Sequence, residues 1–296
     1  MSATTSRPAS PTPTPNPNPT RPVGDLLRAW RERRRLSQMR LALDAGVSTR
    51  HLSFLETGKA RPSREMVERL AAQLDLPLRE RNTLLLAAGF APAYPEHRLD
   101  DPALGAARRV VDRLLVGHEP SPALAIDRHW TLLAANRAVA SLLAGVSPEL
   151  LRPPVNVLRL SLHPAGLAPR IANLGQWRAH LLARLRRQVE VSADATLADL
   201  AAELAAYPAS DDAGSGDRRP TSASAFAGIA VPLLLRTEGG TLAFLSTTTV
   251  FGTPVEVTLA EIAVEAFFPA DAATAEALRR AAESADAPGD AGRARG

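Results

Sequence analysis

Apolar residues recur at three- and four-residue spacing through the first third of the chain, which is the period of an amphipathic helix. Short polar or glycine-containing stretches divide this pattern into five segments. Two serines, Ser37 and Ser48, stand where helix N-caps belong, and Pro62 and Ser63 open a further amphipathic helix. The pattern predicts an all-α bundle of five helices within residues 22–96, and the last of these helices spans about 78–88.

Residues 36–62 read LSQMRLALDAGVSTRHLSFLETGKARP and predict two short helices joined by a tight turn. Gly46 can take a positive φ at low cost and end the first helix, while Ser48 caps the second. Leu52 and Leu55 are three residues apart and can face the core, which leaves a polar, basic face outward. This is the layout of a helix-turn-helix that reads DNA.

The patterns SQ, LAxxAGVS and LSxLExGKxRPS resemble the lambda-repressor and Cro-type family of bacterial regulators. The longer stretch STRHLSFLETGKARPSREMVERLAAQLDLPLRERNTLLLAAGFAP narrows the resemblance to the MmyB-like transcriptional regulators, a bacterial group with a distinctive C-terminal domain. The resemblance implies that Glu56 orients neighbouring groups. Together with the helix cap, the predicted DNA-binding residues are Gln38, Ser48, Thr49, Arg50, Ser53, Phe54, Lys59 and Arg61.

The chemistry of these residues suits the roles that the resemblance implies. Arg50 can donate two hydrogen bonds to guanine O6 and N7, and Phe54 offers an apolar surface to a thymine methyl. Gln38, Lys59 and Arg61 would bind backbone phosphates, which fix register without reading sequence. Two alternatives remain open: a bundle whose basic face is merely solvated, and a helix-turn-helix that makes protein contacts alone.

Charge is unevenly distributed along the 296 residues, a length that favours about two domains. Residues 1–95 hold 15 Arg or Lys and 8 Asp or Glu, a balance of +7, whereas the remainder hold 20 and 23, a balance of −3. The basic end is therefore the expected DNA end. The chain has no cysteine, which excludes disulfides and thiolate ligands. Neither a membrane span nor a signal peptide is apparent, so we expect a cytoplasmic protein.

Beyond the bundle the pattern changes. We expect disordered tails at 1–21 and 286–296, a connector helix within 97–122, a second domain over 123–285 and a mobile loop at 210–224. In the second domain we expect strands at 123–126, 130–135, 228–236, 242–250 and 253–257. We expect helices at 136–143, 171–189, 196–206 and 271–284, and a further helix that Thr258 and Glu261 begin and that reaches about Ala266. Asn136 is the expected cap of the first of these helices, and Thr196 with Asp199 has capping-box spacing at the start of the third. Glu238-Gly239-Gly240 is the expected hairpin turn.

Strands, helices and then a run of antiparallel strands are the element order of a PAS-like α+β domain. The stretches ANRAVASLL, NVLRLSLHPAGLAPRIANLGQWRAHLLARLRRQV and FLSTTTVFGTPVEVTLAEIAVEAFFPADAAT extend the resemblance to the MmyB-like group over this domain. The resemblance implies an internal pocket for an apolar, fatty-acid-like small molecule. The candidate pocket residues are Trp130, Leu133, Asn136, Leu158, Leu160, His163, Trp177, Phe244, Thr248 and Phe251, with Leu181, Phe226 and Arg170 beside them.

Three functions follow for the whole chain. The first is a homodimeric regulator of double-stranded operator DNA that responds to an apolar effector and has no membrane partner. The second is a DNA-binding regulator whose C-terminal domain serves only dimerisation or protein docking. The third, an enzyme fused to a DNA-binding unit, is disfavoured, because no catalytic motif, metal-ligand spacing or phosphate-binding glycine loop occurs. We expect no cofactor.

Overall fold

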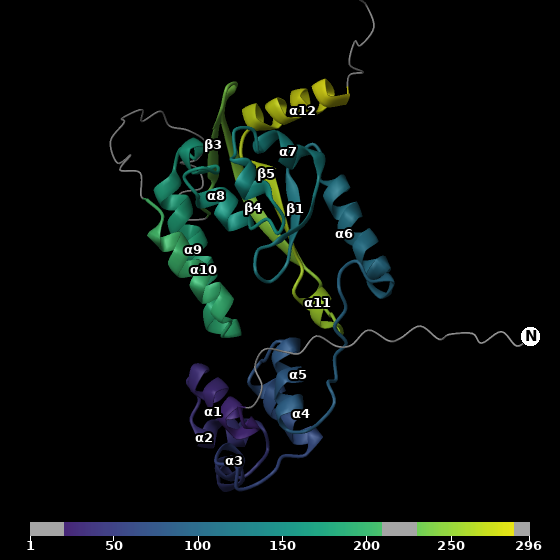
Figure 1. Cartoon of the computed structure of the whole chain (residues 1–296), viewed down its shortest axis with the longest axis vertical. Coiled ribbons are helices and arrows are strands. Elements are labelled where there is room, and N and C mark those ends of the chain that lie inside the picture. The colour runs from purple at the N-terminus through teal and green to yellow at the C-terminus, as the bar shows by residue number, and fades with distance from the viewer. Residues whose placement is uncertain (1–20, 209–229, 287–296) are drawn as a thin grey trace, which may run out of the picture. The chain divides into compact units, whose positions relative to one another are not determined.

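The computed structural model describes residues 21–208 and 230–286 (Figure 1). The predicted tails lie outside these residues, apart from Arg21 and Asp286 at their edges. The predicted loop at 210–224 and the pocket candidate Phe226 also lie outside them. Contacts divide the chain into two compact units, with the division between Ala93 and Tyr94.

The first unit is an all-α bundle, as the hydrophobic period predicts. Its described helices are α1 (Val23–Arg33), α2 (Gln38–Asp44), α3 (Thr49–Glu56), α4 (Arg64–Gln73) and α5 (Leu78–Ala87). Their apolar faces form one core, in which Leu27, Leu41, Leu52, Leu55 and Leu70 are fully buried. This core holds the short helices α2 and α3, which seven or eight residues could not stabilise alone.

The two predicted serine caps are confirmed, and Ser63 caps α4 in the same way. The hydroxyl oxygens of Ser37, Ser48 and Ser63 accept the backbone N–H groups of the residues three positions on, at 3.1, 3.1 and 3.3 Å. Between α2 and α3, Gly46 has a φ of +66°, the left-handed conformation that glycine adopts without a Cβ penalty. Local sequence therefore fixes where the two helices begin and how the chain turns between them.

The second unit is an α+β domain built on a five-stranded sheet. The strands are β1 (Ala123–Ile126), β2 (Leu132–Ala135), β3 (Leu233–Thr237), β4 (Gly240–Val250) and β5 (Ala263–Pro269). Their order across the sheet is β2-β1-β5-β4-β3, and all neighbours are antiparallel. The predicted hairpin turn joins β3 to β4, where Thr237 pairs with Gly240.

Helices cover both faces of this sheet (Figure 1). They are η1 (Pro102–Leu104), α6 (Gly105–Gly117), α7 (Arg137–Leu142), η2 (Pro148–Leu151), α8 (Val157–Leu162), η3 (Ala168–Arg170), α9 (Leu174–Ser192), α10 (Ala195–Ala206), α11 (Val257–Ala260) and α12 (Ala272–Asp286). The segment expected as a connector contains α6, whose Val111 and Leu115 pack on the sheet residues Ala123, Ala125 and Val264. The other face carries α8, α9 and α10, whose apolar residues share a core with β1, β3 and β4.

Two strand and helix predictions near the C-terminus are wrong. In the segment 253–257, expected as a strand, residues 253–256 are irregular and Val257 begins α11, while Val255 is 75% exposed. The helix expected to reach Ala266 ends after the single turn α11, and residues 263–269 form β5 at the centre of the sheet. A central strand is covered on both faces and so lacks the polar–apolar alternation that identifies a strand in sequence.

Two capping predictions are also wrong. The carboxylate of Asp194, rather than Thr196 with Asp199, caps α10 by accepting the backbone N–H groups of Thr196 and Leu197. The Asn136 side chain does not cap α7, because its amide serves the buried sheet edge instead. It donates to the carbonyls of Leu115 and Ser121 and accepts from the backbone N–H of Ala123.

Among the helices of residues 21–208 and 230–286, none is long and apolar enough to span a membrane.

Candidate nucleic-acid interface and ligand cavity

The outward face of α3 carries the side chains that the sequence assigned to base contacts. Leu52 and Leu55 point into the core and are fully buried. Thr49 and Arg50 are exposed, and Ser53, on the same face, is half-buried. Because the two leucines are three residues apart on one side of the helix, the polar residues of α3 face away from the bundle.

Phe54 lies between two cations on this face. The guanidinium carbon of Arg50 is 5.3 Å from the centre of the Phe54 ring, and the Lys59 ammonium is 6.0 Å from it. Both distances are within the range of cation–π attraction. Gly58, with a φ of +70°, ends α3 and turns the chain so that Lys59 and Arg61 follow as exposed cations. The arrangement places two positive charges, those of Arg50 and Lys59, against one aromatic ring.

A buried ion pair ties α3 to α1 and α2. The Glu56 carboxylate accepts hydrogen bonds from Arg31 Nε at 2.6 Å and Arg31 Nη2 at 2.9 Å. Gln38 Nε2 donates a third bond to the same carboxylate at 2.7 Å. Because Gln38 is the first residue of α2, Glu56 fixes how the start of α2 sits against the end of α3. The orienting role that the resemblance implies for Glu56 is consistent with these contacts.

Close helix packing at the same place requires glycine at position 24. A Cβ on Gly24 would meet the backbone carbonyl oxygens of Leu55 and Glu56. The absence of a side chain therefore lets α1 approach the C-terminal end of α3.

The second unit contains a cavity of about 100 Å³ between α8, α9 and the sheet. An engineered apolar cavity of about 150 Å³ stays dry and binds benzene, so this size suits a small apolar group or part of an aliphatic chain. Its described lining is mostly apolar: Pro122, Leu124, Trp130, Leu132, Val139, Leu142, Leu143, Val157, Leu158, Leu160, Leu167, Trp177, Leu181, Leu233, Leu235 and Phe267, with Ser161, Arg184, Ser246 and Glu265.

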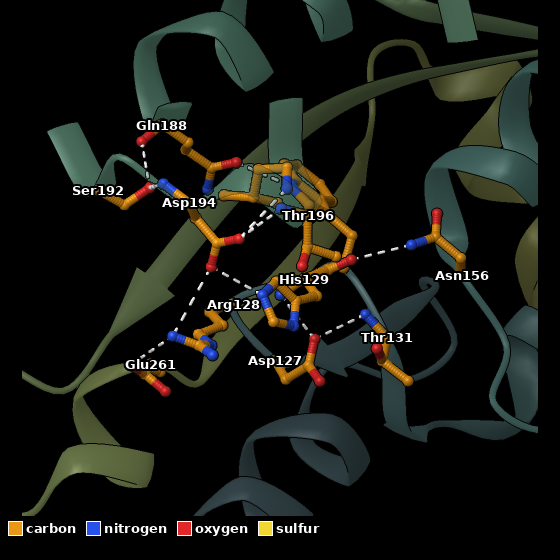
Figure 2. A network of polar contacts seen from close by, with 12 residues as sticks. Asp127, Arg128, His129, Thr131, Asn156, Gln188, Ser192, Asp194, Thr196 and Glu261 are labelled. Atoms are coloured by element: carbon orange, nitrogen blue, oxygen red, sulfur yellow. Dashed lines mark hydrogen bonds and ion pairs between the residues drawn. The ribbon is translucent and has the colours of Figure 1, made fainter. Parts of the chain in front are cut away.

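Trp130 enters this cavity from a strained turn. Its φ of +64° lies in the left-handed region, which costs a bulky residue about 1–3 kcal/mol. The Asp127 carboxylate supports the turn by accepting the backbone N–H groups of His129 and Thr131, each at 2.8 Å (Figure 2). The indole N–H of Trp130 donates to Gln188 of α9 at 2.7 Å. The turn between β1 and β2 thus fixes one wall of the cavity.

A second set of contacts anchors that turn to the junction of α9 and α10 (Figure 2). His129 Nε2 lies 2.8 Å from the Asp194 carboxylate, and Arg128 lies 3.7 Å from both Asp194 and Glu261. Burial alone would raise the pKa of Asp194, but the His129 hydrogen bond and the charges of His129 and Arg128 lower it overall. The turn carrying Trp130 is consequently held from two sides.

The polar part of the cavity wall is an ion pair between α9 and β5. Arg184 Nη1 donates to Glu265 at 3.0 Å and Nη2 donates to the same carboxylate at 2.5 Å. The Thr248 hydroxyl bonds both partners at 2.9 Å, because Thr248 and Glu265 are directly opposite each other on β4 and β5. The Arg184 guanidinium carbon is 4.5 Å from the centre of the Trp130 ring.

Trp177 forms the wall beside this ion pair. Its indole N–H donates to the Ser161 hydroxyl at 2.9 Å, and His180 stacks on its ring with 5.6 Å between centroids. Burial, followed by the positive charges of Arg184 and Arg187, lowers the pKa of His180 below its usual value.

Four of the ten predicted pocket residues come together at this cavity, namely Trp130, Leu158, Leu160 and Trp177. The remaining six lie elsewhere. Phe244 is fully buried in the adjoining core, whereas Leu133 and Phe251 pack in the cluster beneath α6. His163 is a turn residue whose Nδ1 accepts the backbone N–H of Ala165, and Arg170 donates to backbone carbonyls. Asn136 joins α6 to β1, and Thr248 reaches the cavity only through the ion pair.

Sequence reasoning missed Arg184 and Glu265. Arg184 was not among the candidate residues, although it lies seven residues after Trp177 and three after Leu181, and so on the cavity face of α9. That spacing was an available signal. Glu265 gave none, because its segment was expected to be helical.

Comparison with known proteins agrees with both units. Residues 22–84 match a helix-turn-helix domain family, and residues 107–281 match the MmyB-like transcription regulator ligand binding domain. The uncharacterized HTH-type transcriptional regulator RghRB of Bacillus subtilis (strain 168) is 37% identical over 76 residues, which are 25% of this chain and 52% of that protein. The chain thus matches about half the length of this curated relative.

A solved structure of an RNA-binding light-oxygen-voltage receptor is similar at 14% identity over 89% of this chain and 64% of that chain, but its TM-score of 0.22 supports no argument. Around the cavity, no group of three or more described His, Asp or Glu residues could hold a metal ion.

The match to the ligand binding domain extends over more than half of the 296 residues, so the chain belongs to the family of MmyB-like transcription regulators.

Proposed function

We propose that this protein is a sequence-specific, double-stranded DNA-binding transcriptional regulator that acts as a homodimer on two half-sites and performs no catalysis. The observation that carries the proposal is the outward face of α3, where Arg50 and Lys59 lie against Phe54 and Arg61 follows the helix as an exposed cation. An exposed helix face with a basic end is the form in which helix-turn-helix proteins enter the major groove.

The roles within this interface follow from chemistry. Thr49, Arg50, Ser53 and Phe54 face base edges, and Arg50 reads guanine with two hydrogen bonds. Lys59, Arg61, Ser48 and Gln38 contact phosphates of the DNA backbone. These contacts fix the position of the protein on the duplex without reading sequence. Gln38 keeps one amide N–H beyond its bond to Glu56, and this group is the one we assign to a phosphate.

We assign the second unit to sensing of an apolar, fatty-acid-like small molecule, meaning one with a flexible aliphatic chain. Its support is the cavity, whose mostly apolar wall with a few polar groups is typical of small-molecule sites. A domain that served docking alone would gain nothing from leaving this volume unfilled, because empty cavities reduce stability. Sensing requires that the effector bind two conformations of the protein with different affinity.

Selection of duplexes from a random pool by the full-length protein, followed by fluorescence anisotropy on the enriched sequence, tests the DNA-binding proposal. We expect a two-fold symmetric operator and steep weakening with salt. Recovery of random sequences only would contradict it. Native mass spectrometry tests the effector proposal, since a dimer carrying a few hundred extra daltons per chain is the expected species. A ligand-free species that medium-chain amphiphiles leave unchanged would contradict it.

A further inference from the structure

The polar wall of the cavity is a closed pair of opposite charges. Arg184 and Glu265 are joined by two hydrogen bonds, and the Trp130 ring lies against the guanidinium. We propose that the cavity selects a neutral amphiphile, such as an alcohol, aldehyde, ester or lactone, in preference to an ionised carboxylate. This inference rests on the proposed sensing of an apolar small molecule by the same cavity.

Arg184 has little capacity left to neutralise a ligand anion. Its Nη2 donates to both Glu265 and Thr248, its Nη1 donates to Glu265, and one π-face is covered by Trp130. A guanidinium carries five donors, so further hydrogen bonds can form, but its positive charge is already balanced by one carboxylate. The cavity therefore presents hydrogen-bond donors without a net positive charge.

Glu265 adds a repulsive element. Its side chain is 5% exposed, and its carboxylate is held by Arg184 and by Thr248 from the neighbouring strand. A second carboxylate placed against Arg184 would lie close to this buried anion in a medium of low dielectric constant. It would also lose its hydration, a cost that an unpaired charge recovers poorly.

The other basic residues near this wall do not change the charge balance between Arg184 and Glu265. His180 stacks on the Trp177 ring, and burial together with the charges of Arg184 and Arg187 lowers its pKa, which favours the neutral imidazole. Arg187 is exposed, so water and salt screen its charge. Among the described residues lining the cavity, Arg184 is the one cation.

A neutral oxygen-containing head has suitable partners. The Ser161 hydroxyl accepts from the Trp177 indole and, within the described part of the chain, donates to no residue. A hydroxyl carries one donor and two acceptor positions, so its O–H is available for a carbonyl or hydroxyl oxygen. Ser246 contributes a second hydroxyl to the lining. These groups favour a ligand with one or two hydrogen-bonding oxygens and no charge.

The test compares 1-decanol with decanoate on the full-length protein at pH 7.5, with tryptophan fluorescence as the readout because Trp130 and Trp177 line the cavity. We expect decanol to bind about tenfold to a hundredfold more tightly, the ratio that corresponds to an uncompensated buried polar or charged group. Equal or tighter binding of decanoate would overturn the inference while leaving the proposed sensing intact. Binding of neither molecule, nor of their longer homologues, would overturn both.

Variants test the cause of the preference. Glu265→Gln removes the buried anion and leaves the Arg184 cation unbalanced, so decanoate should gain at least about tenfold and the preference should shrink or reverse. Glu203→Gln is the matched control, because Glu203 also pairs with an arginine through two hydrogen bonds, at 2.8 and 2.6 Å, but on the surface. It should leave the preference unchanged. Thermal unfolding shows whether each variant is folded. If Glu265→Gln is not folded, the comparison of decanol with decanoate on the wild-type protein still tests the preference for a neutral ligand.

Discussion

Replacing Glu56 by alanine should destabilise the first unit more than any exposed substitution in it. The change removes three hydrogen bonds at once, two from Arg31 and one from Gln38. It also leaves the Arg31 guanidinium, whose side chain is 11% exposed, without the buried carboxylate that binds it through two hydrogen bonds. Removing one partner of a buried pair costs about 3–5 kcal/mol, mostly from the uncompensated charge that remains.

That loss is large relative to the whole unit. A unit of this size holds roughly 4–11 kcal/mol of unfolding free energy, at 0.05–0.15 kcal/mol per residue. Glu56→Ala should therefore bring the bundle close to its unfolding threshold and abolish operator binding, while the second unit stays folded. Hydrogen exchange of peptides from α1 and α3, measured in the full-length protein, reports the local free energy of opening.

Glu32→Ala is the matched control. Glu32 also approaches Arg31, at 3.8 Å, but it is exposed and pairs mainly with Arg28 one turn away. Exposed pairs contribute little to stability, so exchange in α1 and α3 should hardly change. The reasoning would be refuted if the Glu56 variant exchanged no faster than the Glu32 variant.

Three further predictions concern other parts of the molecule. Arg50→Ala should weaken operator binding by about 1–3 kcal/mol and relax specificity at one base pair. Lys59→Ala should weaken binding to all sequences alike and reduce the dependence of affinity on salt concentration. Fluorescence anisotropy on operator variants and at several salt concentrations distinguishes the two effects. Gly24→Ala should destabilise the bundle by about 1–3 kcal/mol, because the new methyl meets backbone carbonyls of α3, and its denaturation midpoint measures this. Because burial and neighbouring arginines lower the pKa of His180 in the folded state, stability should be constant above about pH 6.5 and fall below it, and His180→Gln should remove that dependence in thermal unfolding at pH 7.5 and 5.5. An unchanged pH dependence in that variant would contradict the assignment.

The first unit is largely predictable from sequence because its determinants are local. Ser37 and Ser48 cap helices through bonds to residues three positions away, and Gly46 adopts its positive φ without a Cβ penalty. Leu52 and Leu55 follow the helical period that places them in the core. Each signal lies within one turn of the structure that it specifies, so no knowledge of distant residues is needed.

The second unit was predictable in class but not in detail. Its antiparallel sheet and its family resemblance were readable, yet β5 was mistaken for a helix because a strand covered on both faces shows no alternation. Asn136 was expected to be a cap because it precedes a helix. Its side-chain amide instead donates to the carbonyls of Leu115 and Ser121 and accepts from the backbone N–H of Ala123. The choice between local and distant partners depends on burial, which the sequence does not state.

The helix-turn-helix, its outward residues and the presence of a second, PAS-like domain follow from local patterns in the sequence. The chemistry of the cavity depends on tertiary packing, because Arg184 and Glu265 are 81 residues apart, one on a helix and the other on a strand. Their pairing arises where α9 crosses β5, and no periodicity or motif encodes that crossing. Local hydrogen bonds can be read from spacing, whereas the neutralisation of one buried charge by another depends on the packing of the whole domain.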